Sequence, residues 1–413
     1  MGSRVGRRSI VAAGLGIGAV FAVARTVASA DSSAEPFLWI DIPPGSLAVP
    51  APAASALDMQ VSISGIDLFP TADNTATATS GVGDIAIAIG NGANAASTTG
   101  IFDLAVANGT DSSATAGYIG IFDAAIADSA DSRAAAGLGS ILGLAFADGT
   151  SSNASTGVGG VADVAIADGT ASTAGAGFGG VSDIAIADGA ASNVGAGSLG
   201  FFDTAVGLGA GSHADTGFGA VLGAAGAFGE DSTAFVVASL GDLAAALGAH
   251  SSASAGVGTA DLAVGDFGGV AEALGLLEAA FGNGGNSDAT AGGIVGLAFS
   301  LGTDIKALAS GILDVAAVFG TNAEAEALDG IADLAAALNT GSAFDEAIAG
   351  GSTAGLGNLD IATIIGTGSS ALAGSDLITA GNLDLAAAFG DMLAANATGG
   401  NFLIDVLLPF LSL

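Results

Sequence analysis

Aspartates that recur at a fixed spacing are the side chains of this sequence best suited to chemistry. One set opens a repeated phrase such as Asp183-Ile184-Ala185-Ile186 and comprises Asp103, Asp123, Asp163, Asp183 and Asp203; a second, five residues further on, comprises Asp128, Asp148, Asp168 and Asp188. In stacked copies, neighbouring carboxylates of one set would lie ~5 Å apart and repel by ~1 kcal/mol even in bulk water. Solvation, hydrogen bonds from turn amides or a divalent cation could each relieve that repulsion.

For both sets we expect a solvated acidic edge with turn-capping aspartates. The alternative is Ca²⁺ bound by Asp103, Asp123, Asp163, Asp183 and Asp203, which makes Ca²⁺ the one candidate cofactor. Calcium-binding β-rolls of the RTX type differ in detail, because Gly179-Gly180-Val181-Ser182-Asp183 lacks their Gly-Gly-x-Gly-x-Asp spacing.

Serine recurs at the tenth position of the same unit, at Ser112, Ser132, Ser152, Ser172, Ser192, Ser212, Ser232 and Ser251. A hydroxyl donates and accepts, so we expect a ladder in which each serine donates to one neighbour in the stack and accepts from the other. This role is structural. No spacing indicates a catalytic triad, the two histidines are unpaired in sequence, and Lys306 follows no phosphate-binding loop. We therefore expect no enzymatic activity.

The unit that carries both patterns repeats every 19 or 20 residues through most of the chain. Each copy resembles two short strands: Asp163 to Ala167 alternates and ends at Asp168-Gly169, and Ser172 to Phe178 ends at Gly179-Gly180. A single copy cannot bury an apolar face, whereas stacked copies bury a continuous core. The sequence thus predicts an all-β fold, a parallel β-solenoid or β-roll of about sixteen or seventeen coils.

Alternation in the first strand places Val164 and Ile166 on one face and Asp163, Ala165 and Ala167 on the other. We expect the alanines to face outward, as a flat, mildly apolar array suited to side-by-side packing of rods.

Regular repeats are expected over 59–261 and degenerate repeats over 262–400. Within 262–350, the segments Ala271 to Glu278 and Ala323 to Leu338 have the composition of helices, so some coils there could be helical. Later repeat starts at Gly296, Asp314 and Asp333 favour continuation of the solenoid. The apolar residues 401–413 are expected to cap the last coil or, alternatively, to form a docking tail.

Residues 1–30 have the pattern of an export signal. Arg4, Arg7 and Arg8 precede an apolar run of signal-peptide length, and Ala28-Ser29-Ala30 supplies the small-x-small pattern, with Ala28 and Ala30 at the cleavage site. Sec and Tat export both remain open. Residues 31–58 hold five of the seven prolines and read as a linker.

Charge restricts the partners. The chain carries 40 acidic against 6 basic residues, a net charge of −34, and loss of the four arginines in residues 1–30 would leave −38. Nucleic acids and anionic lipid surfaces would repel it. No membrane span is expected after signal cleavage, and the absence of cysteine excludes disulfides and thiolate metal sites.

The export signal, the Gly/Ala-rich repeats, the scarcity of lysine and the acidity together resemble the secreted Gly/Ala-rich repeat proteins of mycobacteria and related actinobacteria. The chain lacks the helical PE domain and the Gly-Gly-Ala triplets of the PE-PGRS type. The phrase from Ile85 to Ala95 is similar to the head repeats of trimeric autotransporter adhesins, which are β-rolls. The resemblance implies a secreted or envelope-associated protein.

These observations predict an exported, non-enzymatic structural or adhesive rod; the alternative is a Ca²⁺-dependent binding module. Its partner would be an envelope or host-surface component or, by lateral self-association, another copy of the chain.

Overall fold

In the computed structural model the chain divides into two compact units, Met1–Ala56 and Leu57–Leu413. The structure describes residues 58–69, 74–238, 240–267, 269–338, 345–349, 360–365, 369–373, 384–389, 393–397 and 403–407, all in the second unit. The signal peptide, its cleavage site at Ala28 and Ala30, almost all of the linker and the ends of the 401–413 segment lie outside these residues.

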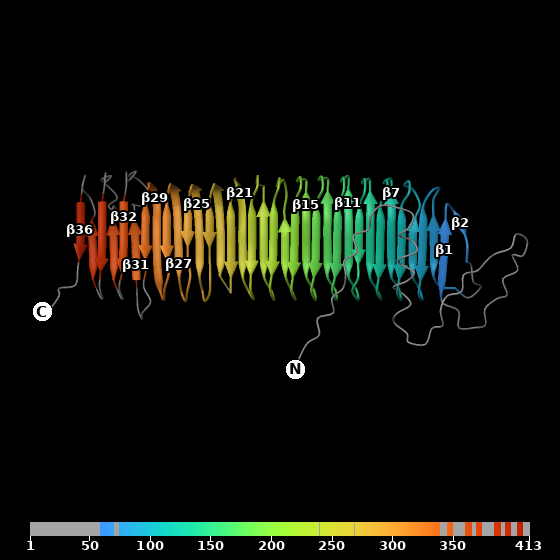
Figure 1. The fold of residues 1–413 in the computed structure, drawn as a ribbon, viewed down its shortest axis with the longest axis horizontal. Helices are drawn as coiled ribbons and strands as arrows, with labels where there is room; N and C mark the ends of the chain where they lie inside the picture. The colour runs from blue at the N-terminus through green and yellow to red at the C-terminus, as the bar shows by residue number, and fades with distance from the viewer. Residues whose placement is uncertain are drawn as a thin grey trace, which may run out of the picture. The chain divides into compact units, whose positions relative to one another are not determined.

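The second unit is a parallel β-solenoid built from two sheets, with no helix among its described residues (Figure 1). Nineteen described strands form sheet A. In spatial order they are β2 (Ile66–Asp67), β1 (Met59–Ile63), β4 (Ile85–Ile89), β6 (Leu104–Asn108), β8 (Ala124–Asp128), β10 (Leu144–Ala147), β12 (Val164–Asp168), β14 (Ile184–Asp188), β16 (Thr204–Leu208), β18 (Ala224–Phe228), β20 (Leu243–Leu247), β22 (Leu262–Asp266), β24 (Ala279–Phe281), β26 (Leu297–Phe299), β28 (Val315–Val318), β30 (Leu334–Ala337), β32 (Asp360–Ile365), β34 (Asp384–Phe389) and β36 (Leu403–Leu407).

Sheet B holds the seventeen described strands that alternate with these along the chain. They are β3 (Thr77–Ser80), β5 (Asn94–Ser97), β7 (Ser113–Tyr118), β9 (Arg133–Leu138), β11 (Asn153–Val158), β13 (Thr173–Phe178), β15 (Asn193–Ser198), β17 (His213–Thr216), β19 (Thr233–Val237), β21 (Ser252–Thr259), β23 (Val270–Leu276), β25 (Asp288–Ile294), β27 (Lys306–Ile312), β29 (Ala323–Ile331), β31 (Asp345–Ala349), β33 (Ser370–Ala373) and β35 (Ala394–Ala397).

Equivalent residues of successive coils are paired directly. Ala165 lies beside Ala185, and Ala185 beside Ala205, in a parallel ladder that keeps the repeat in register. The predicted fold class, an all-β parallel solenoid with a repeat of about 20 residues, is confirmed.

In the described residues of 262–350 the solenoid continues, as the repeat starts favoured, and the alternative of helical coils is wrong. Ala271 to Glu278 contributes β23, and the segment from Ala323 contributes β29 and β30. The helix propensity of these residues is outweighed because their alanines also alternate with other residues, as in a strand. Ala323, Ala325 and Ala327 all face the core. Pairing with the strands on either side then decides the backbone conformation.

The expected orientation of the first strand was also wrong. Ala165 and Ala167 are fully buried between the sheets, as are Ala185 and Ala187, whereas Val164 and Ile166 face outward. A larger core side chain on one sheet faces a smaller one on the other. Val194 occupies an alanine position of sheet B, and the residue that faces it from sheet A is Gly207, where an added Cβ atom would stand 2.7 Å from the Val194 Cγ2 atom. A core this thin accepts a larger side chain only opposite a smaller one.

The first coil is a cap. Strand β1 pairs antiparallel with β4 and covers the open edge of sheet A. Its side chains reach sheet B, where the Gln60 Oε1 atom accepts a hydrogen bond from the Ala78 N–H at 2.9 Å and the Ser62 hydroxyl accepts one from the Ser80 N–H at 3.3 Å. Edge amides that would otherwise pair with another chain are thereby satisfied.

At the other end, β36 is the last described strand of sheet A and pairs parallel with β34. Leu403–Leu407, the described part of the expected cap or tail, therefore forms a strand of the solenoid itself. Asp405 stands in register with the core residue Ala386, and its carboxylate accepts a hydrogen bond from the Asn396 N–H of β35 at 2.8 Å. A charged side chain at a core position of the last coil opposes further stacking.

Candidate interaction face

Two columns of mostly apolar residues run along the outer face of sheet A, at the second and fourth positions of the repeat unit, with Thr204, Gly226 and Thr363 as exceptions. The sixth position also faces outward at the edge of the sheet, where β8, β12, β14 and β22 end in aspartate. These two columns include Ile85, Ile87, Leu104, Ile126, Leu144, Phe146, Val164, Ile166, Ile184, Ile186, Val206, Leu243, Leu262, Val264, Phe281, Leu297, Phe299, Val315 and Leu334. Neither position carries Asp, Glu, Lys or Arg in any described strand from β4 to β36. We call this surface the A-face.

Turns along one side of the solenoid extend the A-face. They lead from sheet B into sheet A, and their bridge residues Ile101, Ile121, Ile141 and Val161 pair in a column and are 38–51% exposed. Phe102 and Phe122 stack outside this column with ring centroids 5.4 Å apart. Between 98 and 102 and at the equivalent places of later coils up to Ala332, Asp329 at the end of β29 is the one charged residue among the described ones.

Acidic residues gather on the opposite side, in the turns that lead from sheet A into sheet B and at the ends of β8, β12 and β14. The exposed carboxylates there are Asp111, Asp128, Asp131, Asp148, Asp168, Asp188, Glu230, Asp231 and Asp304. Partial burial, with repulsion from Asp168 added, raises the pKa of Asp188. For Asp128, Asp148, Asp168 and Asp188, the structure therefore gives the solvated acidic edge that the sequence predicts.

The first aspartate set is not part of that edge. Asp103, Asp123, Asp163, Asp183 and Asp203 are at most 1% exposed and lie inside the solenoid. The Asp183 Oδ1 atom accepts a hydrogen bond from the backbone N–H of Asp203, one coil later, at 3.1 Å, and Asp103 accepts one from Asp123 at 2.8 Å. These carboxylates connect successive coils, and the expectation that they are solvated was wrong.

Two glycines make room for each of these carboxylates. Cβ atoms on Gly100 and Gly117 would stand 1.6 and 1.7 Å from the Asp103 Oδ2 atom. Gly160 and Gly177 enclose Asp163 in the same way, at 1.7 and 2.2 Å from its Oδ2. Gly117 and Gly177 also take positive φ values, of 73° and 76°, which glycine adopts without strain.

Burial raises the pKa values of these carboxyl groups. It raises the pKa of Asp103 and of Asp163 to about 6, with repulsion from the stacked aspartates adding to the rise, and the pKa of Asp203 to about 7. Hydrogen bonds from the next coil oppose the rise only in part. The Oδ2 atoms of Asp183 and Asp203 have no hydrogen-bond partner among the described residues, so the ionised forms are incompletely stabilised.

The serine set is buried as well: Ser112, Ser132, Ser152, Ser172, Ser192, Ser212, Ser232 and Ser251 are at most 1% exposed. Their hydroxyls do not form the expected ladder between coils. Ser172 donates instead to the Gly169 carbonyl, three residues earlier in its own turn, at 2.9 Å, and Ser132 donates to Ser129 at 2.8 Å. Six of the eight serines make this bond to a carbonyl of their own turn, and these six stabilise individual turns.

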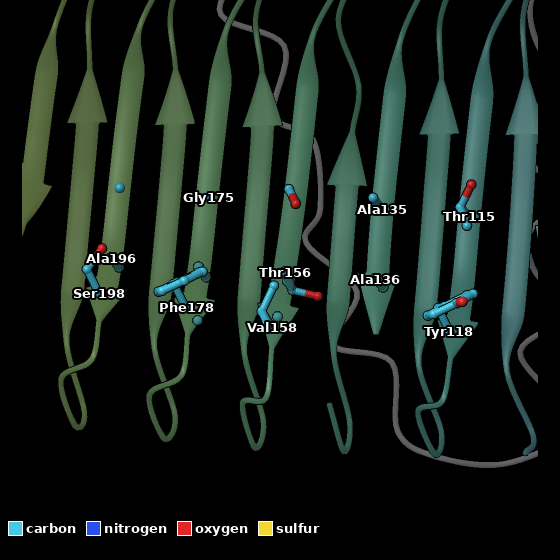
Figure 2. A pocket seen from close by; sticks show the side chains of 15 residues that line it. Thr115, Tyr118, Ala135, Ala136, Thr156, Val158, Gly175, Phe178, Ala196 and Ser198 are labelled. Atoms are coloured by element: carbon cyan, nitrogen blue, oxygen red, sulfur yellow. The ribbon is translucent and has the colours of Figure 1, made fainter. Parts of the chain in front are cut away.

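Sheet B presents a polar outer face with one shallow depression of about 510 Å³. Gly175 and Gly195 leave the strand backbones uncovered at its floor. Figure 2 shows Tyr118, Val158 and Phe178 in one row along its rim, near the same ends of their strands. No Asp, Glu, His, Lys or Arg side chain lines this depression, so its hydroxyl groups have no acidic or basic partner there.

Further along sheet B, Lys306 pairs with Glu324 and Glu326. Partial burial lowers the pKa of Lys306, but the hydrogen bonds to these two carboxylates outweigh it and raise the pKa overall. The pair is half-exposed and stabilises the fold only modestly.

The sequence-based interpretation missed the A-face, because it assigned the alanines of the first strand to the surface. Alanine at the third position of the unit is the signal that could have found it. That residue is identical from Ala86 to Ala335 in the described coils, whereas its neighbours vary among Ile, Val, Leu, Phe, Ala, Gly and Thr. A constant small residue indicates a tight core, and variable apolar residues indicate a surface.

Two further observations concern metal sites and membrane spans. Among the described residues, no three His, Cys, Asp or Glu side chains come close enough together to hold a metal ion. The same part of the chain offers no helix with the length and apolar character needed to cross a bilayer.

In comparisons with known proteins, no family model, curated protein or solved structure matches this chain.

Proposed function

We propose that this chain is an exported, non-enzymatic repeat protein that serves as a structural and adhesive rod in the cell envelope or outside the cell. The observation that carries the proposal is the A-face, an uncharged apolar strip along a chain of net charge −34. Large exposed apolar patches mark sites of interaction with other molecules.

The roles of the recurring polar residues support a non-enzymatic function. The aspartates that would be candidate acids or ligands hold backbone amides of the next coil, and the serines that would be candidate nucleophiles hold turn carbonyls. Both sets contribute to the scaffold. The pattern of residues 1–30 supports export.

Expression of the full chain in an actinobacterial host, with a C-terminal epitope, tests export. We expect a product that begins at Asp31 and is found in the envelope fraction or the medium. The matched control is Ala28→Leu/Ala30→Leu, which should retain the signal. Full-length protein confined to the cytoplasm, with residues 1–30 intact, would refute export.

Envelope retention tests the A-face. The triple variant Ile166→Lys/Ile186→Lys/Val206→Lys places three charges in register on sheet A. Thr173→Lys/Asn193→Lys/His213→Lys places three in the same coils on sheet B. We expect the first variant to be released into the medium and the second to be retained with the wild type. Equal retention of both would show that the A-face does not hold the protein in the envelope.

A further inference from the structure

We propose that the A-face is covered by the A-face of a second copy of this chain, with the two solenoids parallel and related by a two-fold axis along their length. This inference rests on the proposed function only in treating the A-face as an interaction surface; it names the partner.

The size of the A-face is sufficient for a stable dimer. With ~4.8 Å per strand, the seventeen described strands from β4 to β36 extend over roughly 80 Å, and a five-residue strand adds a width of ~16 Å. A face of this size buries on the order of 1,000 Å² per partner, whereas a standard stable interface needs about 800 Å² on each side.

The regular geometry of the A-face favours a second sheet as its partner. Its side chains form columns that follow the strand spacing, because Ile166, Ile186 and Val206 are register neighbours in β12, β14 and β16. Another A-face repeats the same spacing, so two of them can interdigitate along their whole length. An anionic bilayer has no such spacing and would repel the acidic turns.

The ends of the solenoid favour lateral over end-to-end association. At the first coil, β1 covers sheet A, and its Gln60 and Ser62 side chains satisfy edge amides of sheet B. At the last coil, Asp405 occupies a core position and binds the Asn396 amide. The A-face has no comparable cover among the described residues.

Charge determines the relative orientation. The acidic turns form one edge of the A-face, and the uncharged turns of the Ile101 column form the other. A two-fold axis along the solenoid places the acidic edge of each copy beside the uncharged edge of its partner. Antiparallel packing would bring the two acidic edges together, where the carboxylates repel one another.

Sedimentation velocity of the full-length chain tests the association, with the two lysine triple variants described above. We expect a dimer for the wild type and for the sheet B variant, and at least a 10-fold weaker dimer for Ile166→Lys/Ile186→Lys/Val206→Lys. Both variants lower the net negative charge equally, so loss of the dimer in one alone identifies the face. Circular dichroism checks that both retain β structure.

Three outcomes would overturn the proposal: a monomeric wild type at 100 µM, equal dimerisation of both variants, or a monomer that binds phosphatidylcholine vesicles through the A-face. The last would assign the face to a lipid surface. The proposed function fails separately, because a dimeric protein confined to the cytoplasm refutes export alone and a monomeric protein in the envelope refutes only the dimer.

The absence of cysteine permits a direct test of orientation. Spin labels are attached at Ile126→Cys in β8 or, separately, at Val264→Cys in β22, two fourth-position residues of the A-face. Parallel packing predicts a short distance, under about 20 Å, between the labels of a dimer in both variants, because equivalent coils face each other. A distance on the order of 50 Å between the labels at Ile126→Cys would indicate antiparallel packing and refute the orientation, whereas the labels at Val264→Cys, near the middle of sheet A, lie close together in either orientation and report that the dimer has formed.

Discussion

A Cβ atom on Gly160 would stand 1.7 Å from the Oδ2 atom of Asp163, so the glycine and the buried carboxylate depend on one another. In two of the three described coils where glycine replaces this aspartate, at Gly143 and Gly223, the residue three positions earlier is Ser140 or Ala220, whereas Gly296 keeps Gly293. The Ser140 hydroxyl then donates to the Asp123 carboxylate of the preceding coil at 2.8 Å. In these two coils, the side chain three positions earlier fills part of the space that the aspartate fills in the other coils.

This relationship predicts that Gly160→Ala destabilises the solenoid. The added methyl group would collide with the Asp163 carboxylate, which has no free space to enter. We expect a loss of about 1–3 kcal/mol, the usual cost of overpacking a filled core. Urea unfolding followed by circular dichroism measures it.

The double variant Gly160→Ala/Asp163→Gly supplies the control, because it reproduces the natural combination of Ala220 and Gly223. It should recover most of the stability lost in Gly160→Ala. If the two substitutions were simply additive, the glycine and the carboxylate would not compete for space.

The buried aspartates predict that stability falls as pH rises. Their folded-state pKa values, about 6 for Asp103, Asp163 and Asp360 and about 7 for Asp203, lie above the ordinary value of 3.8. A raised pKa means that folding favours the protonated form. Its stabilising contribution is therefore complete below pH 4 and lost between pH 4 and pH 7. Thermal melts from pH 4 to pH 8 should show a falling melting temperature.

The variant Asp203→Asn separates the titration of a buried aspartate from the titration of the exposed carboxylates in that experiment. Repulsion among the exposed carboxylates also grows with pH, but this variant leaves it almost unchanged. We expect Asp203→Asn to melt higher than the wild type at pH 8 and to lose this advantage at pH 4. A constant difference across the range would show that Asp203 does not titrate in the folded protein.

The repeat made the fold predictable. Asp163, Asp183 and Asp203 recur at one spacing with short alternating segments after them, and stacking is the arrangement that buries such segments. Composition misled at Ala323 to Leu338, because alanine, leucine and glutamate favour a helix locally. In-register pairing with both neighbouring coils outweighs that preference.

The site was harder to predict, because alternation separates two faces without saying which is inside. Val164 and Ile166 are larger and more apolar than Ala165, and the usual rule places such residues in the core. A core between two closely spaced sheets reverses that rule, since only methyl-sized side chains fit. The same reversal places Asp163, which shares the parity of the alanines, inside.

The position of the first aspartate set predicts that Ca²⁺ has no effect on folding. Asp103, Asp123, Asp163, Asp183 and Asp203 are buried and face glycines and amides of neighbouring coils. A cation from solvent would have to enter the core and lose its water. We expect the same melting temperature in EDTA, in 5 mM Ca²⁺ and in 5 mM Mg²⁺. A rise specific to Ca²⁺ would restore the aspartates as ligands and favour a Ca²⁺-dependent binding module.

The last prediction concerns how much the side chain of Gln60 in the cap strand β1 stabilises the first strand of sheet B. The Oε1 atom of Gln60 accepts the hydrogen bond of the Ala78 N–H, which otherwise faces the open edge of sheet B. Gln60→Leu keeps the size of the side chain but leaves that amide without an acceptor, at a cost of about 1–3 kcal/mol. Amides of residues 76–80 should therefore exchange with solvent roughly 10-fold faster or more, while those of β13 stay unchanged. Thr79→Ala, on the exposed side of the same strand, should leave exchange at 76–80 as it is. Equal exchange in the wild type and Gln60→Leu would show that the backbone pairing of β1 with β4 suffices to close this end.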